Sequence, residues 1–316
     1  MKLMDYLHWA DVTPDNLNFF RAIGVDSLMV HLPAEMGDGG DHTDELTRMR
    51  ELVEQHGLEL FVYHAHLIPR DLIVHGKPGR EEQIDTWCKV LRAIGAAGVP
   101  NTTTTFYAIS HFRTSTTYGR GGISYSSFDY SEHMQDPPHY PDLVIGEEQL
   151  WENIEYFLQR VVPVAEEAGV RIALHPDDPP IPEPLGGAAR IMVSIENFQR
   201  VFRLAPSASC GMLFCQGCVA EMGEDVVEAI HTIGESGRIF FVHFRNIRGT
   251  SHKFQEVFLD EGDMDMVRAM EAYRDVGFEG PFMMDHTPGI PSDVRGIASR
   301  SYSNGYIKAL LQAVYR

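Results

Sequence analysis

Four residues that can bind a divalent metal follow short apolar runs in the second half of the chain, and they are His175, Cys215, His243 and Asp285. Each run is typical of a strand buried on both faces. Imidazole, thiolate and carboxylate groups all donate to first-row divalent ions. One such residue alone is more often structural, but four at successive strand ends predict a shared ion. The mixed donor set suits a catalytic ion that keeps open positions.

Strand-like segments alternate with helix-period segments along almost the whole chain. The predicted strands are 3–8, 26–31, 58–63, 101–107, 171–175, 209–214, 239–244 and 280–285. The predicted helices are 14–22, 45–55, 81–97, 147–167, 194–202, 223–233, 263–276 and 298–315. This repetition predicts an α/β fold, a closed parallel (β/α)8 TIM barrel formed as a single domain over residues 1–316.

An open doubly wound sheet is the alternative fold, but no Gly-rich phosphate-binding fingerprint follows the first predicted strand. In a barrel, the C-terminal ends of all strands surround one mouth. The four candidate ligands follow the fifth to eighth predicted strands and can therefore meet there. The longest connection, residues 108–145, is rich in Ser, Thr, Tyr, Gly and Pro, and we expect it to lie over the mouth.

Composition excludes several classes of protein. The 316 residues are 44% hydrophobic and 22% charged, which argues against disorder. A formal net charge of -19 is a poor fit to nucleic acid or an anionic membrane as partner. No apolar run approaches the roughly 20 residues that span a bilayer, and no signal-peptide pattern is present, so we expect a cytoplasmic enzyme. Four cysteines are too few for a disulfide framework, and the Cys215–Cys218 pair is only a weak redox signal.

Several motifs resemble those of the mannonate dehydratase family, which has a xylose-isomerase-like barrel. They begin at His175 (His-Pro-Asp-Asp-Pro-Pro), Phe214 (Phe-Cys-Gln-Gly), Val242 (Val-His-Phe-Arg-Asn), Gly262 (Gly-Asp-Met-Asp-Met), Asp285 (Asp-His), Phe112 (Phe-Arg-Thr), Arg120 (Arg-Gly-Gly) and Phe128 (Phe-Asp). The resemblance implies a lyase that removes water from D-mannonate to give 2-keto-3-deoxy-D-gluconate. It implies Mn²⁺, with Fe²⁺ or another first-row divalent metal as alternatives, held by the four candidate ligands. A sugar acid is then the partner, and a homodimer is expected.

The resemblance also suggests residues that act on the substrate. His286, next to Asp285, is the expected acid/base, with a positioning role as the alternative. The other candidates are expected to bind the substrate. Arg113 and Arg120 in the long loop could pair with its carboxylate or be solvated surface residues. Asp177 is a further candidate, although it could instead cap a turn. The last two candidates are Arg245 and Asn246, which follow His243 in sequence and should face the mouth.

The chain departs from the family pattern in two places. Arg295 occupies the position of a catalytic Tyr, and we include it as a substrate-binding candidate. The stretch Val62-Tyr-His-Ala stands where the family has an acidic residue. Two other functions therefore stay open: a sugar isomerase or epimerase of the same barrel class, and a catalytically silent homologue that binds a sugar acid.

Overall fold

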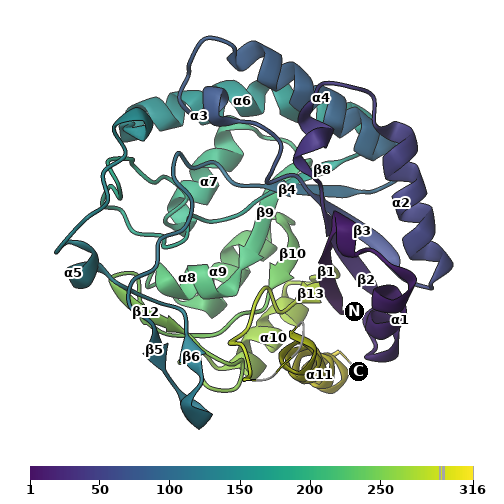
Figure 1. Cartoon of the computed structure of the whole chain (residues 1–316), viewed down its shortest axis with the longest axis vertical. Coiled ribbons are helices and arrows are strands. Elements are labelled where there is room, and N and C mark those ends of the chain that lie inside the picture. The colour runs from purple at the N-terminus through teal and green to yellow at the C-terminus, as the bar shows by residue number, and fades with distance from the viewer. Residues whose placement is uncertain (292, 294–295, 316) are drawn as a thin grey trace.

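Eight parallel strands form the central sheet of the protein, whose computed structural model describes residues 1–291, 293 and 296–315. In spatial order they are β1 (Met4–His8), β2 (Ser27–His31), β3 (Glu59–His64), β4 (Asn101–Thr104), β8 (Arg171–Leu174), β9 (Cys210–Cys215), β10 (Ile239–His243) and β13 (Phe282–Met283). A parallel bridge between Leu3 and Phe282 joins the last strand to the first, so the sheet closes. Figure 1 shows β13 beside β1 at this closure. The predicted barrel is confirmed, and each predicted strand lies within a few residues of an observed one.

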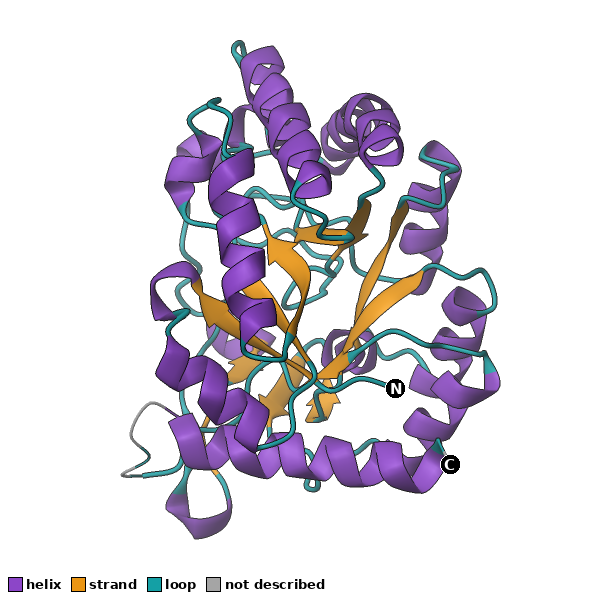
Figure 2. Cartoon of the chain, turned by 90° about the vertical axis from the view of Figure 1, so that its right-hand side faces the viewer, coloured by secondary structure: helices purple, strands orange, loops and turns teal. Residues whose placement is uncertain are grey.

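Helices surround the sheet, as Figure 2 shows. The longer ones are α1 (Pro14–Ala22), α2 (Thr43–Gln55), α4 (Arg80–Ala96), α6 (Glu147–Ala168), α7 (Ile195–Leu204), α9 (Val226–Gly234), α10 (Met266–Asp275) and α11 (Ile297–Val314). Thr13 caps α1 by accepting a hydrogen bond from the Asn16 N–H, with Pro14 at the first helical position. Gly169 ends α6 with a φ of 68°, a left-handed conformation that glycine adopts without steric cost. None of the described helices is long and apolar enough to cross a membrane.

Among the described residues, the buried apolar side chains form four clusters, and the two largest include residues of the barrel strands. The largest cluster lies between the strands and the helices and includes Trp87, Phe157 and Phe198, which are all buried. A smaller cluster, which includes Met29, Phe241 and Met283, packs separately from it. β4 is polar but equally buried, because its side chains bond neighbouring strands: Thr102 Oγ1 donates to Tyr63 O and Thr103 Oγ1 donates to Ala173 O, both at 2.8 Å.

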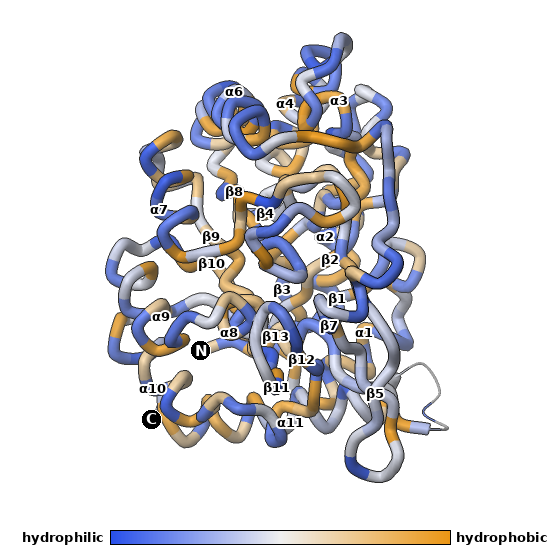
Figure 3. Tube along the Cα trace, turned by 90° about the vertical axis from the view of Figure 1, so that its left-hand side faces the viewer, coloured by the Kyte–Doolittle hydropathy of each residue, from blue (hydrophilic) through white to orange (hydrophobic). Residues whose placement is uncertain are grey.

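The connections at the mouth carry structure of their own, which the sequence did not predict. β7 (Ser127–Asp129) in the long loop pairs with β12 (Lys253–Glu256), and β12 pairs with β11 (Ile247–Thr250) in a three-stranded antiparallel sheet. Figure 3 shows β7, β12 and β11 in one part of the molecule. The remaining elements are short: β5 (Thr117–Tyr118), β6 (Ser124–Tyr125), α3 (Asp71–Val74), α5 (Tyr130–His133), α8 (Gln216–Glu221), and the 3-10 helices at Trp9–Asp11, Ala34–Gly37, Arg120–Gly122 and Pro141–Leu143.

Candidate metal centre

The four predicted ligands stand where adjacent strands end. His175 follows β8 directly, Cys215 is the last residue of β9, and His243 is the last residue of β10. Cys215 and His243 are register partners, so they lie at one level of the barrel. Asp285 comes two residues after β13. The closure of the sheet therefore carries all four residues to one part of the mouth.

Their ligand atoms converge on the sulfur of Cys215. Cys215, His243 and Asp285 offer donor atoms that all lie within 4.8 Å of one another, and His175 joins Cys215 and Cys218 in an overlapping set of the same size. The ring centroids of His175 and His243 are 5.3 Å apart. Cys215 is fully buried, and the side chain of Asp285 is 19% exposed, so the group faces solvent on one side only.

The hydrogen bonds of the two histidines fit metal binding. Nδ1 of His175 donates to Pro176 O at 2.7 Å, an arrangement that leaves the lone pair on Nε2. Both ring nitrogens of His243 are buried and lack a hydrogen-bond partner among the described residues, although Nδ1 lies 3.3 Å from Asp285 Oδ1. Buried polar atoms without a partner are costly, and a bound cation would satisfy one of these nitrogens.

Two neighbouring cysteines differ in protonation. Burial alone would raise the pKa of Cys215, but a hydrogen bond from Cys218 and the charge of Arg245 hold it well below its ordinary value. Burial and the adjacent sulfur of Cys215 raise the pKa of Cys218 well above its ordinary value. Cys215 is therefore the thiolate of the pair, which is the form that binds metals.

The carboxylate of Asp285 depends on an unusual backbone conformation. Its φ is 66°, and it is the only residue other than glycine with a positive φ in the described part of the chain. Such a conformation costs on the order of 1–3 kcal/mol and persists only where the surroundings enforce it. Burial opposes ionisation of Asp285, but the charges of His243 and His286 hold its pKa well below the ordinary value, so the group is a carboxylate.

Arg245 lies behind the metal ligands at the centre of a buried ion-pair network. Its side chain is 1% exposed. One terminal nitrogen, Nη1, lies 2.7 Å from Glu256 Oε1, and the other, Nη2, lies 2.9 Å from Glu221 Oε1 and 3.1 Å from Cys218 Sγ. These contacts occupy the guanidinium, so the predicted role of Arg245 in direct substrate binding has no support in this geometry.

His286 lies at the solvent side of the same network, with its side chain 43% exposed. Nδ1 is 3.3 Å from Glu256 Oε2, whereas Nε2 is 3.1 Å from Arg245 Nη1 and 3.4 Å from Asp285 Oδ2. The imidazole is therefore both accessible and held by charged groups on either side. That combination suits a residue that exchanges protons with a substrate.

The two arginines predicted in the long loop have different surroundings. Arg113 reaches the network, where Nη2 bonds Asp178 Oδ2 at 2.8 Å and also contacts Glu256. Arg120 instead forms a two-point ion pair with Asp260, at 2.6 and 2.9 Å, and its side chain is 43% exposed. Arg113 is thus brought to the candidate centre, and Arg120 is not among the residues that contact it.

Two further predicted substrate residues hold the backbone of loops. Asp177 is 1% exposed and accepts hydrogen bonds from the backbone N–H groups of Ile191 and Met192, both at 3.0 Å. Asn246 is equally buried, and its amide donates to the carbonyl of Leu259 at 2.9 Å. Both side chains are buried and bonded to loop backbone, and their roles in substrate binding remain predictions. Arg295 lies outside the described residues.

The sequence reasoning missed two groups of residues beside the centre. Glu221 and Glu256 are buried acids that pair with Arg245, and no local pattern marks them. The second group is a set of histidines at the ends of the first three strands, which ring contacts bring together. The sequence could have indicated this group, because His8 and His31 are each the last residue of a predicted strand.

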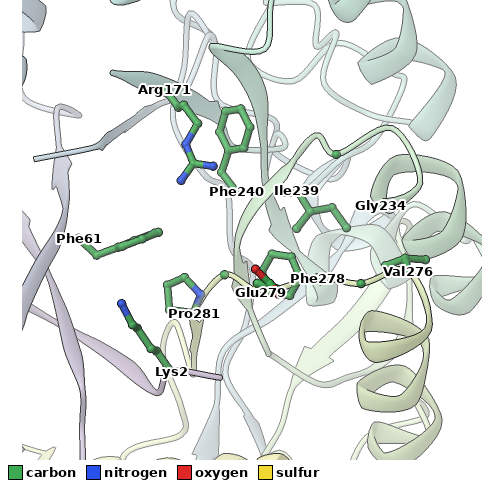
Figure 4. Close-up of a pocket in the computed structure, with 13 residues that line it drawn as sticks. Lys2, Phe61, Arg171, Gly234, Ile239, Phe240, Val276, Phe278, Glu279 and Pro281 are labelled. Carbon is green, nitrogen blue, oxygen red and sulfur yellow. The ribbon is translucent and has the colours of Figure 1, made fainter. Parts of the chain in front are cut away.

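A pocket of about 330 Å³ opens at the other end of the barrel, where the strands begin. Figure 4 shows Arg171 beside Phe240, whose ring centroid lies 4.8 Å from the guanidinium carbon, with Phe61 and Lys2 across the pocket. The sites of TIM-barrel enzymes lie at the C-terminal ends of the strands, so this pocket is not the candidate active site.

Comparisons with known proteins point to one family. A family model described as D-mannonate dehydratase (UxuA) matches residues 139–316. Mannonate dehydratase 2 of Halalkalibacterium halodurans is 29% identical over 303 residues, which cover 86% of this chain and 87% of the relative. Mannonate dehydratase of Thermotoga maritima is 28% identical over 311 residues, which cover 86% of each protein.

Solved structures give the same result. The crystal structure of mannonate dehydratase from Streptococcus suis serotype 2 matches with a TM-score of 0.89 and 28% identity, covering 99% of this chain and 94% of that one. D-psicose 3-epimerase from Clostridium cellulolyticum H10 matches with a TM-score of 0.66 and 14% identity over 99% of each chain, which shows a shared fold. Because the family model matches more than half of its residues, the chain belongs to the D-mannonate dehydratase family.

Proposed function

We propose that the protein is a metal-dependent hydro-lyase that converts D-mannonate into 2-keto-3-deoxy-D-gluconate and water. The observation that carries this proposal is the convergence of His175, Cys215, His243 and Asp285 at the mouth, where neither ring nitrogen of His243 makes a hydrogen bond to another described residue. Family membership and the likeness to the Streptococcus suis enzyme support the same reaction.

These four side chains are the proposed ligands of a single divalent ion, with Mn²⁺ as the proposed metal. A donor set of two imidazoles, one thiolate and one carboxylate leaves positions open for substrate oxygens. The chemistry that such an ion supplies is stabilisation of the negative charge that develops beside the substrate carboxylate when the C2 proton leaves. This contribution matters because Arg113 and Arg245 are already paired with carboxylates of the protein.

His286 is the proposed acid/base. Its exposure lets it reach a bound sugar acid, and Glu256 and Asp285 hold the ring from both sides. His286 takes the C2 proton and becomes an imidazolium. It can then donate that proton to the C3 hydroxyl, which departs as water. The electron pair of the C2–H bond becomes the new double bond, and the resulting enol rearranges to the 2-keto product. Arg113 and Arg245 act as positioning residues, because both hold Glu256.

The test is incubation of the Mn²⁺-loaded protein with D-mannonate, with detection of the 2-keto-3-deoxy acid. We expect turnover by the wild-type protein and by His231→Ala, a control that removes a half-buried histidine of α9. We expect none by His286→Ala. Absence of turnover across a panel of hexonates and pentonates would contradict the proposal. Tight binding without reaction would favour a silent sugar-acid-binding protein, and sugar interconversion without loss of water would favour an isomerase.

A homodimer remains the proposed assembly. Light scattering on the purified protein tests it directly, and a monomer at assay concentration would contradict it.

A further inference from the structure

A row of histidines lines the mouth at the ends of the first three strands, and nothing in the proposed reaction uses it. His8, His31 and His64 are the last residues of β1, β2 and β3. The strand register pairs His8 with His31 and His31 with His64, so the three lie side by side at one level. His66 follows two residues after β3. Residues in register on neighbouring parallel strands point to the same side of the sheet, which explains why these rings meet.

Three of these rings are spaced as metal ligands are. The nitrogens of His31, His64 and His66 lie within 4.8 Å of one another. Their ring centroids are 4.4 to 4.9 Å apart. His64 Nδ1 is 3.4 Å from His31 Nε2. Two nitrogens that each sit about 2.0–2.1 Å from a tetrahedral zinc ion are separated by about 3.3 Å, so this pair needs almost no movement to share one.

The hydrogen-bonding state of the cluster points the same way. Nδ1 of His66 is buried and has no hydrogen-bond partner among the described residues, so it is free to bind an ion. Native proteins rarely leave buried ring nitrogens unsatisfied. The rings are also uncharged at neutral pH, because burial and the neighbouring histidines lower the pKa of His31 and of His64. Neutral imidazole is the form that binds metals.

We propose that His31, His64 and His66 form a second divalent-cation site, separate from the site of Cys215, and that it binds a zinc-type ion. Three imidazoles without a carboxylate or thiolate favour Zn²⁺ over Mn²⁺ or Mg²⁺. Three protein ligands leave one position of a tetrahedral ion open for water or for an oxygen of a molecule in the mouth.

Metal stoichiometry tests the proposal without any measurement of activity. Metal-free protein is titrated with Zn²⁺ by calorimetry, and the bound metal is counted by elemental analysis after dialysis. We expect two equivalents for the wild-type protein and for the His231→Ala control. We expect one for His64→Ala, one for Cys215→Ala, and none for the double variant. Circular dichroism establishes that each variant is folded, and His66→Gln, at a half-buried position beyond β3, replaces His64→Ala if that variant does not fold.

Cobalt spectra distinguish the two sites. Co²⁺ bound to Cys215→Ala should give tetrahedral visible bands without thiolate charge transfer, whereas Co²⁺ bound to His64→Ala should retain that charge transfer. A single equivalent in the wild-type protein, or a second equivalent that survives both His31→Ala and His64→Ala, would overturn the proposal. Neither result depends on turnover of D-mannonate, so failure of the proposed reaction leaves this test intact.

Discussion

Removal of the Arg245 side chain is the sharpest test of the buried ion-pair network. In Arg245→Ala, Glu221 and Glu256 lose a partner at 2.9 and 2.7 Å, and Glu221 is completely buried. Breaking a buried pair by removing one member costs about 3–5 kcal/mol. Glu256 keeps Arg113, and burial already raises the pKa of Glu221 well above its ordinary value, so protonation relieves part of the loss. We therefore expect a cost of about 3 kcal/mol, at the lower end of that range.

Arg120→Ala is the matched control, because Arg120 also forms a two-point contact with a carboxylate, that of Asp260. Its side chain is 43% exposed against 1% for Arg245. Exposed ion pairs contribute about 0–1 kcal/mol. Unfolding in urea, followed by circular dichroism, measures both variants.

With an m-value of about 3 kcal/mol/M, the urea midpoint should fall by about 1 M for Arg245→Ala and by less than about 0.3 M for Arg120→Ala. Equal shifts for the two variants would refute the reasoning, because burial would then make no difference to the value of the pair. A larger shift for Arg120→Ala would refute it as well.

Three further predictions concern the two histidine-containing clusters and the packing around Arg245. Cys215→Ala should lower activity more than about 100-fold while the barrel stays folded. The control Cys88→Ala removes a buried cysteine of α4 and should keep activity. Loss of the circular-dichroism signal in Cys215→Ala would instead indicate that Cys215 is a core residue. Burial, with the charges of His66 and His8, lowers the pKa of His31 from 6.5 to about 3. Between these values the unfolded chain binds a proton that the folded protein does not, so stability falls as the pH drops from 6.5 towards 3. The decrease in the urea midpoint between neutral and acid pH should be smaller in His31→Gln than in the wild-type protein. An equal decrease in the two proteins would contradict this account. Gly217→Ala would place a methyl group 2.3 Å from Arg245 Nε and should cost about 1–3 kcal/mol in urea unfolding. Gly305→Ala, in α11 with nothing within 4 Å, should be neutral or stabilising by up to about 1 kcal/mol, and a similar loss in both variants would argue against the steric explanation.

The barrel and the positions of the metal-binding side chains were predictable from sequence because both depend on local pattern. A buried parallel strand appears in the sequence as a short apolar run, such as the run of four residues that precedes His243 in β10. Closure of the sheet then brings the residues at the end of each strand to one mouth. The proximity of Cys215 and Asp285 could therefore be predicted without knowing the loop structures.

The arginine contacts were not predictable, because they depend on pairing between distant loops. Glu256 is the last residue of β12, and it lies 143 residues from Arg113 and 11 residues from Arg245 in sequence. Nothing in local composition separates Arg245, whose side chain is buried, from Arg120, whose side chain is 43% exposed. Asn246 follows a predicted ligand but turns inward to bond the carbonyl of Leu259, since a buried loop backbone needs a partner.

The three-stranded sheet of β7, β12 and β11 ties together two connections that leave different strands of the barrel. Insertions in such loops are usually tolerated independently of one another. Here a residue added to either segment would shift its hydrogen-bond ladder against the other and would withdraw Glu256 from His286. In relatives with a different substrate preference, we therefore expect the lengths of these two loops to change together.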